Sequence, residues 1–439
     1  MEPGRKIQTA DIPATPSPNP QDIDEKNYEV IDVTFPEGGL QAWLTVMGGW
    51  MIVFCTFGAI QSFGVYQDYY TRISLSDQSP SHISWIGSVQ IFFLFSGGII
   101  SGKLFDDGWF RGLLLSGSLI YLVSSFLLSL AQPHHYYQNF LAQGVGMGIG
   151  MGIIFLPTLS VTAHYFKRKR GLVMGIILSG SSVGAVVYPI MINHLFNGSS
   201  GFAWGVRAVS FLDLGLLVFA NLIMKTRLPP RNKDPNAKPV NTRAILTDTP
   251  FWIALFGILL AFWGLFVPFF YIQTFAVTHN LPGFLQTYAL SILNAAGFFG
   301  RTLPMFISDI YGPLNVIIPI TLISGCLVFA FLGATNVGGM LAFAILYGFF
   351  SGGFVSLSAP TAASFSQDIG EVGTRLGLMT FVSSFGLLTG NPISGAILHP
   401  PEYIWIRPVV FSAVTVLGGV LFLLIARQIQ AKRRKTHRL

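Results

Sequence analysis

Residues 97–111 read GGIISGKLFDDGWFR, and residues 300–314 read GRTLPMFISDIYGPL. The two stretches share a glycine and an aspartate in one register, because Gly97 and Asp106 coincide with Gly300 and Asp309 when the chain is shifted by 203 residues. The same shift aligns further landmarks: Pro157-Thr158 with Pro360-Thr361, Ser181 with Ser384, and Pro189-Ile190 with Pro392-Ile393. One register that holds across three regions indicates an internal duplication, and this duplication decides the architecture.

The composition indicates a chain that is solvated by lipid. Hydrophobic residues make up 51% of the 439 residues, charged residues only 10%, and the mean hydropathy is +0.59. Soluble domains carry roughly 25% charged residues, so this chain could not cover itself with a water-compatible surface. The net charge of +7 could suggest nucleic acid, but the basic residues lie in short clusters between apolar stretches. That distribution is typical of membrane topology signals, and we expect no nucleic-acid partner.

The apolar stretches predict twelve transmembrane helices in an all-α membrane fold. Each is long enough to cross ~30 Å of hydrocarbon, which takes ~20 helical residues. The apolar runs are continuous and do not alternate with polar residues, which favours helices over a membrane barrel. The predicted spans are 43–66, 83–105, 112–131, 139–163, 171–195, 204–225, 250–275, 283–307, 314–333, 338–360, 374–398 and 405–427.

The duplication divides these spans into two halves of six helices. Because six is even, both halves have the same orientation, and a pseudo-two-fold axis along the membrane normal should relate them, with a solute site between them. The expected organisation is a disordered cytoplasmic tail at 1–36, an N-terminal half at 37–226, a cytoplasmic linker at 227–249, a C-terminal half at 250–427 and a basic cytoplasmic tail at 428–439.

Lysine and arginine predict the orientation. All basic residues except Arg72, Arg207 and Arg407 fall on the side that also carries both termini. Positive charge accumulates in cytoplasmic segments, so we expect both termini inside, in a multi-pass protein of the plasma membrane. The sequon Asn197-Gly198-Ser199 then lies on the outer face and is a candidate glycosylation site.

The stretch from Gly102 to Arg111 resembles the loop motif of the major facilitator superfamily. That motif combines a glycine, an aspartate and nearby basic residues. The aspartate can lie at a helix N-terminus or face an arginine, and so stabilise one conformation. The resemblance implies a conformational latch formed by Gly102, Asp106, Arg111 and, in the degenerate second copy, Asp309. The alternative is a plain solvated turn.

Further stretches resemble the monocarboxylate porter family, especially its fungal branch. They include Glu37-Gly38-Gly39-Leu40-Gln41-Ala42-Trp43 at the first span and Gly180-Ser181-Ser182-Val183-Gly184 in the fifth. The resemblance covers nearly the whole chain after residue 35 and implies alternating-access transport, often proton-coupled, of organic acids or other small organic solutes. Gln61 stands where animal lactate carriers of this family have a substrate-linked lysine. Gly297 stands where they have an aspartate one turn before the arginine.

Polar residues within the spans are candidates for the solute site. A charge in a membrane span is costly unless it is paired or hydrated, which singles out Arg301. We expect Arg301, Asn294 and Gln61 to bind substrate from the polar lining of the cavity; Asn294 and Arg301 share a helix face. The alternative for Arg301 is that its side chain extends to the cytoplasm and pairs with Asp309.

Asp213 lies about midway through the sixth span, where an ionised carboxylate is expensive. One interpretation is a proton-coupling site. The other is a protonated or locally hydrogen-bonded carboxyl, because the sixth helix of this fold is usually peripheral and Arg207 lies on a different helix face.

These features predict secondary active transport of a small organic solute between the two halves, without an enzyme activity. We find no nucleophile–base pair and no metal cluster, and Leu104 replaces the Ser or Thr that a phosphate-binding loop needs, so no cofactor is expected. Arg301 favours an organic anion over a neutral solute, and a cation is not expected. The aromatic residues Phe269, Phe270 and Tyr271 suit a ring-bearing body. The alternative function is a receptor or nutrient sensor on the same fold, which binds a solute without moving it.

Overall fold

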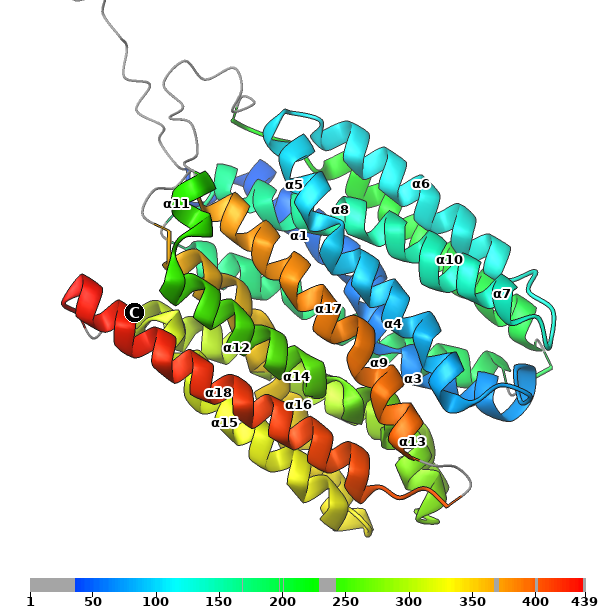
Figure 1. The fold of residues 1–439 in the computed structure, drawn as a ribbon. Coiled ribbons are helices and arrows are strands. Elements are labelled where there is room, and N and C mark those ends of the chain that lie inside the picture. The colour runs from blue at the N-terminus through cyan, green and yellow to red at the C-terminus, as the bar shows by residue number, and fades with distance from the viewer. Residues whose placement is uncertain are drawn as a thin grey trace, which may run out of the picture. The chain divides into compact units, whose positions relative to one another are not determined.

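The protein is described here from a computed structural model that covers residues 36–167, 169–196, 198–199, 201–228, 242–366, 371–398 and 402–436. Within these residues, twelve helices are long and apolar enough to cross a membrane (Figure 1), and the twelve predicted spans are confirmed. The predictions for the tail at 1–35, for linker residues 229–241 and for the sequon Asn197 lie outside the described residues.

Among the first six spans, spans 1, 2 and 4 consist of several consecutive helical segments. Span 1 joins α1 (Leu40–Val53), the π-helix η1 (Phe54–Gly58), α2 (Ala59–Gln61), α3 (Phe63–Tyr69) and the π-helix η2 (Tyr70–Ser74). Span 2 is α4 (Pro80–Ser96) with α5 (Gly98–Asp106), and span 3 is α6 (Phe110–Leu128). Span 4 joins α7 (Tyr136–Asn139), η3 (Phe140–Met147), α8 (Gly148–Ser160) and η4 (Val161–His164). Spans 5 and 6 are α9 (Arg170–Phe196) and α10 (Gly201–Ile223).

The last six spans are mostly single helices. The short α11 (Thr242–Leu246) precedes span 7, which consists of α12 (Thr249–Leu265) and α13 (Val267–Thr278). Span 8 is α14 (Gly283–Tyr311), and span 9 is α15 (Pro313–Ala330) with η6 (Phe331–Gly333). Spans 10, 11 and 12 are α16 (Val337–Ser364), α17 (Val372–Leu398) and α18 (Ile406–Arg434).

Gly97 and Gly300, which coincide in the internal duplication, both allow two helices to pack closely. A Cβ added to Gly97 in span 2 would lie 2.8 Å from the Cα of Gly152 in span 4. A Cβ added to Gly300 in span 8 would lie 2.0 Å from the carbonyl oxygen of Phe349 in span 10. Neither site has room for a side chain. Small residues let membrane helices approach to backbone contact, and here they do so at equivalent places in the first and last six spans.

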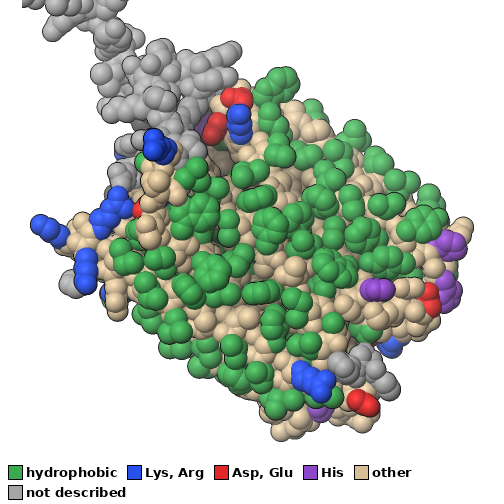
Figure 2. Space-filling model, viewed as in Figure 1, with side chains coloured by type: hydrophobic (Ala, Val, Ile, Leu, Met, Phe, Trp, Pro, Cys, Tyr) green, Lys and Arg blue, Asp and Glu red, His purple; other side chains and the backbone are tan. Residues whose placement is uncertain are grey.

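The first six spans contact the last six mainly through α4 and α5 against α17, α9 against α14, and α3 against α13. The flank of the bundle is apolar, and Figure 2 shows hydrophobic side chains across it, with lysine and arginine gathered at the end where the C-terminus lies. We call this the basic end: it carries the starts of α1, α9 and α17 and the ends of α5, α14 and α18. We call the other the opposite end, where the described basic residues are Arg72, Arg207 and Arg407.

Candidate functional site

Arg301 connects the two sets of six spans at the centre of the bundle. Its side chain is 2% exposed, and Nη1 donates to Ser181 Oγ at 2.5 Å and to Ser182 Oγ at 2.7 Å, both in α9. Nη2 donates to Gln61 Oε1 in α2. The guanidinium also lies over the ring of Phe57, 5.6 Å from its centroid. We call these five residues the Arg301 cluster.

The Arg301 cluster holds a positive charge with neutral partners. Among the described residues, Arg301 makes no ion pair with a carboxylate, and its Nε has no hydrogen-bond partner. A buried, hydrogen-bonded charge without a counter-charge remains costly inside a membrane protein, so an anionic ligand would be favoured here. Asn294, two turns earlier in α14, is buried and uses its Nδ2 on the Leu290 carbonyl at 3.0 Å, while its Oδ1 has no partner.

A small cavity of about 40 Å³ lies beside this cluster, between the two sets of spans and displaced toward the basic end. Its lining is mostly apolar and includes Phe57, Phe95 and Phe155 from the first six spans and Val355 and Met379 from the last six. Gln61, Asn294 and Arg301 are not part of this lining; Phe57 is the residue that touches both the cavity and the guanidinium.

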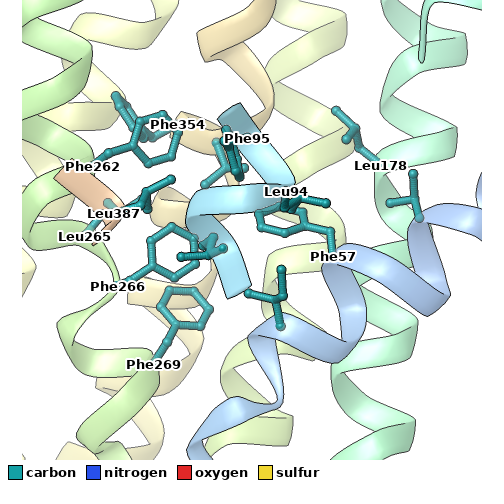
Figure 3. Packing of buried hydrophobic residues seen from close by; sticks show 14 of the residues in the cluster. Phe57, Leu94, Phe95, Leu178, Phe262, Leu265, Phe266, Phe269, Phe354 and Leu387 are labelled. Carbon is teal, nitrogen blue, oxygen red and sulfur yellow. The ribbon is translucent and has the colours of Figure 1, made fainter. Parts of the chain in front are cut away.

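An aromatic cluster adjoins the cavity through Phe57 and Phe95, which also line it (Figure 3). Phe95 packs against Phe262 of span 7 with ring centroids 5.8 Å apart, and Phe262 packs against Phe354 of span 10 at 5.0 Å. Phe57 lies 6.4 Å from Phe266 by the same measure. Rings from both sets of six spans therefore meet beside the cavity and form an apolar, polarisable wall.

The opposite end is closed by contacts between the two sets of spans. Phe63 in α3 packs against Phe270 in α13, with ring centroids 5.2 Å apart. A Cβ added to Gly64 would come within 2.9 Å of the Phe269 carbonyl oxygen, and Ser81 Oγ donates to the Pro392 carbonyl at 3.1 Å. Phe269 and Phe270 thus contribute to this closure and do not line the cavity.

At the basic end, each latch aspartate lies against the first turn of a helix from the other set of spans. A Cβ added to Gly171, near the start of α9, would lie 2.6 Å from Asp309 Oδ1. A Cβ added to Gly373, near the start of α17, would lie 3.8 Å from Asp106 Oδ2. Helix N-termini attract negative charge, so both carboxylates favour this arrangement of the two sets.

The other two latch residues make contacts within the first six spans. Gly102 faces span 4, where a Cβ on it would lie 3.0 Å from Leu156 Cδ2. Arg111 donates to the Asn221 carbonyl at the end of α10. These two residues therefore position the loop between spans 2 and 3 against its own half.

Comparison with known proteins identifies the family of this protein and its general function. Residues 40–331 match the Major Facilitator Superfamily. The chain belongs to the major facilitator superfamily. It is 39% identical over 389 residues to the aspyridones efflux protein apdF of Emericella nidulans, covering 88% of this chain and 78% of the relative. It is 39% identical over 388 residues to the agnestins efflux protein AgnL12 of Paecilomyces divaricatus, covering 88% and 87%.

A third relative, the MFS-type transporter pynF of Aspergillus niger, is 36% identical over 397 residues, which cover 90% of each chain. The protein is therefore a multi-pass membrane transporter of the superfamily, as predicted, and not an enzyme.

Sequence reasoning missed an ion-pair network in the last six spans of this superfamily member. Arg375 in α17 is 2% exposed and pairs with Asp248 at 2.7 Å and with Glu371 at 3.1 Å. Arg433, near the end of α18, pairs with the other oxygen of Asp248 at 2.9 Å. The guanidinium of Arg375 also lies 4.7 Å from the ring centroid of Phe251. The available signal was an arginine at the start of a predicted span, with an acidic residue four positions before it.

Asp213 in α10 faces the interior of the first six spans and is fully buried. Its Oδ2 accepts from the Tyr121 hydroxyl in α6 at 2.7 Å, and its Oδ1 accepts from the Tyr188 hydroxyl in α9. Arg207, on the same helix, instead donates to Ser129 and lies over the Trp204 ring. Asp213 therefore lies in a hydrogen-bonded site remote from the cavity lining, and it shares α9 with the Arg301 cluster.

Proposed function

We propose that this transporter exports an organic anion with an apolar, ring-bearing body, by alternating access of two six-helix halves. The observation that carries the proposal is Arg301, a buried cation that joins the halves through the neutral partners Ser181, Ser182 and Gln61. A carboxylate or enolate of the solute would supply the missing counter-charge through charge-assisted hydrogen bonds.

The shape and chemistry of the cavity support an aromatic or otherwise apolar body. Phe57, Phe95 and Phe155 stand around it, and few polar groups line it. Phe57 contacts both the guanidinium and the cavity, so a solute whose ring packs on Phe57 can bring its anionic group to Arg301 after a small movement of this side chain. A neutral solute would use the same wall without using the charge.

Export is favoured by the names of the relatives. The names of two relatives state that they are efflux proteins for aspyridones and for agnestins. The basic end is the cytoplasmic one under the positive-inside rule, which would place both termini inside. The cavity is displaced toward this end while the opposite end is closed, so in an exporter of the plasma membrane this state would precede opening to the outside.

Asp106 and Asp309 would then stabilise the cytoplasmic contacts of this state, and opening toward the cytoplasm would need both carboxylates to leave their helix N-termini. The resemblance to monocarboxylate porters agrees with an acid as solute. The receptor alternative has no support from the relatives named above, which are described as efflux proteins and transporters.

Counterflow in proteoliposomes tests the proposal. Vesicles loaded with unlabelled aromatic carboxylic acids of one to three rings are diluted into trace labelled acid, with the methyl esters as matched neutral compounds and protein-free vesicles as background. Protein-dependent accumulation of at least one acid, with weaker accumulation of its ester, is the expected result. Equal movement of acids and esters would overturn the anion proposal. Saturable binding without any counterflow would support the receptor.

A further inference from the structure

Asp213 belongs to a group of hydrogen-bonding side chains from four helices. Tyr121 in α6 and Tyr188 in α9 donate to its two oxygens. The Cys55 thiol in η1 lies within hydrogen-bonding reach of the same carboxyl, and Tyr66 in α3 faces it at longer range. These four are the titratable groups that face Asp213 among the described residues, and no Lys, Arg or His is among them. A permanently ionised carboxylate would therefore have hydrogen bonds but no counter-charge.

The Tyr121 hydroxyl has two acceptors and a single proton to donate. Its oxygen lies 2.7 Å from Asp213 Oδ2 and 3.0 Å from the carbonyl oxygen of Cys55. When Asp213 is ionised, the phenol donates to the carboxylate, because charge-assisted hydrogen bonds are the stronger ones. When Asp213 is protonated on Oδ2, its own O–H donates to the Tyr121 oxygen. The phenolic proton is then free to turn to the Cys55 carbonyl.

The Cys55 carbonyl lies in η1, the π-helical segment of span 1. Short π-helical segments inside membrane helices change the hydrogen-bond register and occur often at functional sites. The same segment carries Phe57, which touches the cavity and Arg301, and it is followed by Gln61, which accepts from Arg301. Tyr188 lies in α9, seven positions after Ser181. The Asp213 group and the Arg301 cluster are thus joined by both span 1 and span 5.

We infer that Asp213 is a proton-binding site, and that Tyr121 and the π-helical segment transmit its proton occupancy to the Arg301 cluster. The inference rests on the proposed function, because it concerns the regulation of the same solute site. Binding of one proton from water converts the carboxylate into an acid and redirects one phenolic proton, so that the Cys55 carbonyl gains a bond. Loss of the proton to water reverses both changes and removes that additional bond to the carbonyl. The conformation of η1, and with it the positions of Phe57 and Gln61, then depends on pH.

Two variants separate proton binding from its transmission. Asp213→Asn places an amide donor toward Tyr121 and imitates the protonated acid at every pH. Tyr121→Phe leaves the carboxyl in place and removes the connection to Cys55. The matched control is Ser210→Ala, which breaks the buried 2.6 Å bond between Ser125 and Ser210 on the same two helices and changes no titratable group.

The first measurement is pH-difference infrared spectroscopy of purified protein without solute, in the range where the carbonyl of a protonated carboxylic acid absorbs. A band that titrates is expected in the native protein, in Tyr121→Phe and in Ser210→Ala, and its loss is expected in Asp213→Asn. A band present at every pH, or absent at every pH, would overturn the proton-binding site. This result does not depend on whether the protein carries organic anions.

The second measurement is counterflow of labelled aromatic acid across a pH series. In the native protein and in Ser210→Ala, half-saturation should change with pH by up to about tenfold per pH unit, the limit for linkage to one proton. In Asp213→Asn and Tyr121→Phe that dependence should be lost while counterflow persists. If Tyr121→Phe keeps the native pH profile, transmission through Tyr121 is wrong. If no variant or native protein moves the acids while the infrared band still titrates, the proposed solute class fails and the proton site stands.

Discussion

Replacing Arg301 with glutamine tests the anion proposal most directly. Glutamine can still hydrogen-bond Ser181 or Ser182, so the contact between the halves is weakened but not removed. The variant loses the positive charge and the unpartnered Nε, which are the groups available to an incoming carboxylate. Solutes that carry a carboxylate should therefore be affected much more than their neutral esters.

The magnitude follows from the geometry at the guanidinium. With three donor contacts on neutral oxygens, Arg301 can offer the solute Nε and part of one Nη, which is enough for two charge-assisted bonds. Such bonds contribute about 1.5–3 kcal/mol each, and we take ~3 kcal/mol for the pair after desolvation. At about 1.4 kcal/mol per factor of ten, half-saturation for the acid should rise roughly a hundredfold. The ester should stay within about twofold by the same conversion.

The assay is counterflow of one acid and its methyl ester in the native protein, Arg301→Gln and Arg301→Lys. Lysine keeps the charge but not the planar fork, so it should give an intermediate loss of acid transport. Thr302→Ala is the matched control, since Thr302 neighbours Arg301 but is only partly buried and donates its hydroxyl within α14, to the Phe298 carbonyl. An unchanged acid half-saturation in Arg301→Gln would refute the reasoning. An equal loss for acid and ester would show instead that Arg301 serves only to join the halves.

Three further predictions concern the ends of the bundle. Gly171→Ala puts a methyl group 2.6 Å from Asp309 Oδ1, so the carboxylate must leave the start of α9. The variant loses ~0.3–1 kcal/mol of attraction between the carboxylate and the helix N-terminus. Cysteines introduced into the cavity should therefore be labelled about two- to fivefold faster by a reagent that enters from the basic end. Arg375→Leu leaves two carboxylates without their main partner and should lower the free energy of unfolding by ~3–5 kcal/mol in detergent. Arg433 is half-exposed, so Arg433→Ala should lower the free energy of unfolding by under ~1 kcal/mol. The hydrogen bond from His134 lowers the pKa of Asp77, so this contact stabilises the fold above the ordinary pKa of an aspartate, and the stabilisation is lost as the pH falls through the lowered pKa. His134→Ala should therefore flatten the thermal unfolding profile below about pH 5, and an unaltered acid slope would contradict this.

The sequence predicts the helices well because one physical requirement dominates them. A membrane span needs ~20 apolar residues, and that length is visible in hydropathy without knowledge of packing. Most predicted spans are shorter than the helices themselves: the prediction for span 1 is 43–66, and the helix extends over Leu40–Ser74. The helices continue into the interfacial region, where polar residues such as Gln67 and Asp68 no longer mark an end. The π-helical segment Phe54–Gly58 left no signal, since hydropathy does not record the register of backbone hydrogen bonds.

The site was only partly foreseeable. Arg301 and Asp213 stand out as charges in apolar spans, and both are buried. Their partners could not be named, because serine and tyrosine hydroxyls are common in membrane helices and become specific only when other helices bring them close. Tyr121 and Tyr188 reach Asp213 from spans 3 and 5. Phe269 and Phe270, which the sequence suggests would suit a ring-bearing solute, lie outside the cavity lining in this structure. A sequence shows which helix is aromatic, but not the depth at which the two sets of spans are in contact.

The two buried arginines, Arg375 and Arg301, differ in the charge of the groups they bind. Arg375 connects helices within the last six spans and has two carboxylates, Asp248 and Glu371, so separating it from them would strand charges in a poorly solvated site. These helices should therefore move together. Arg301 connects the two sets of spans and binds only neutral oxygens, so its bonds can break without leaving a bare anion behind. An anionic solute that binds the guanidinium in place of these neutral oxygens would weaken the contact between the halves when it binds. Occupancy and opening would then be linked through one side chain, as alternating access requires.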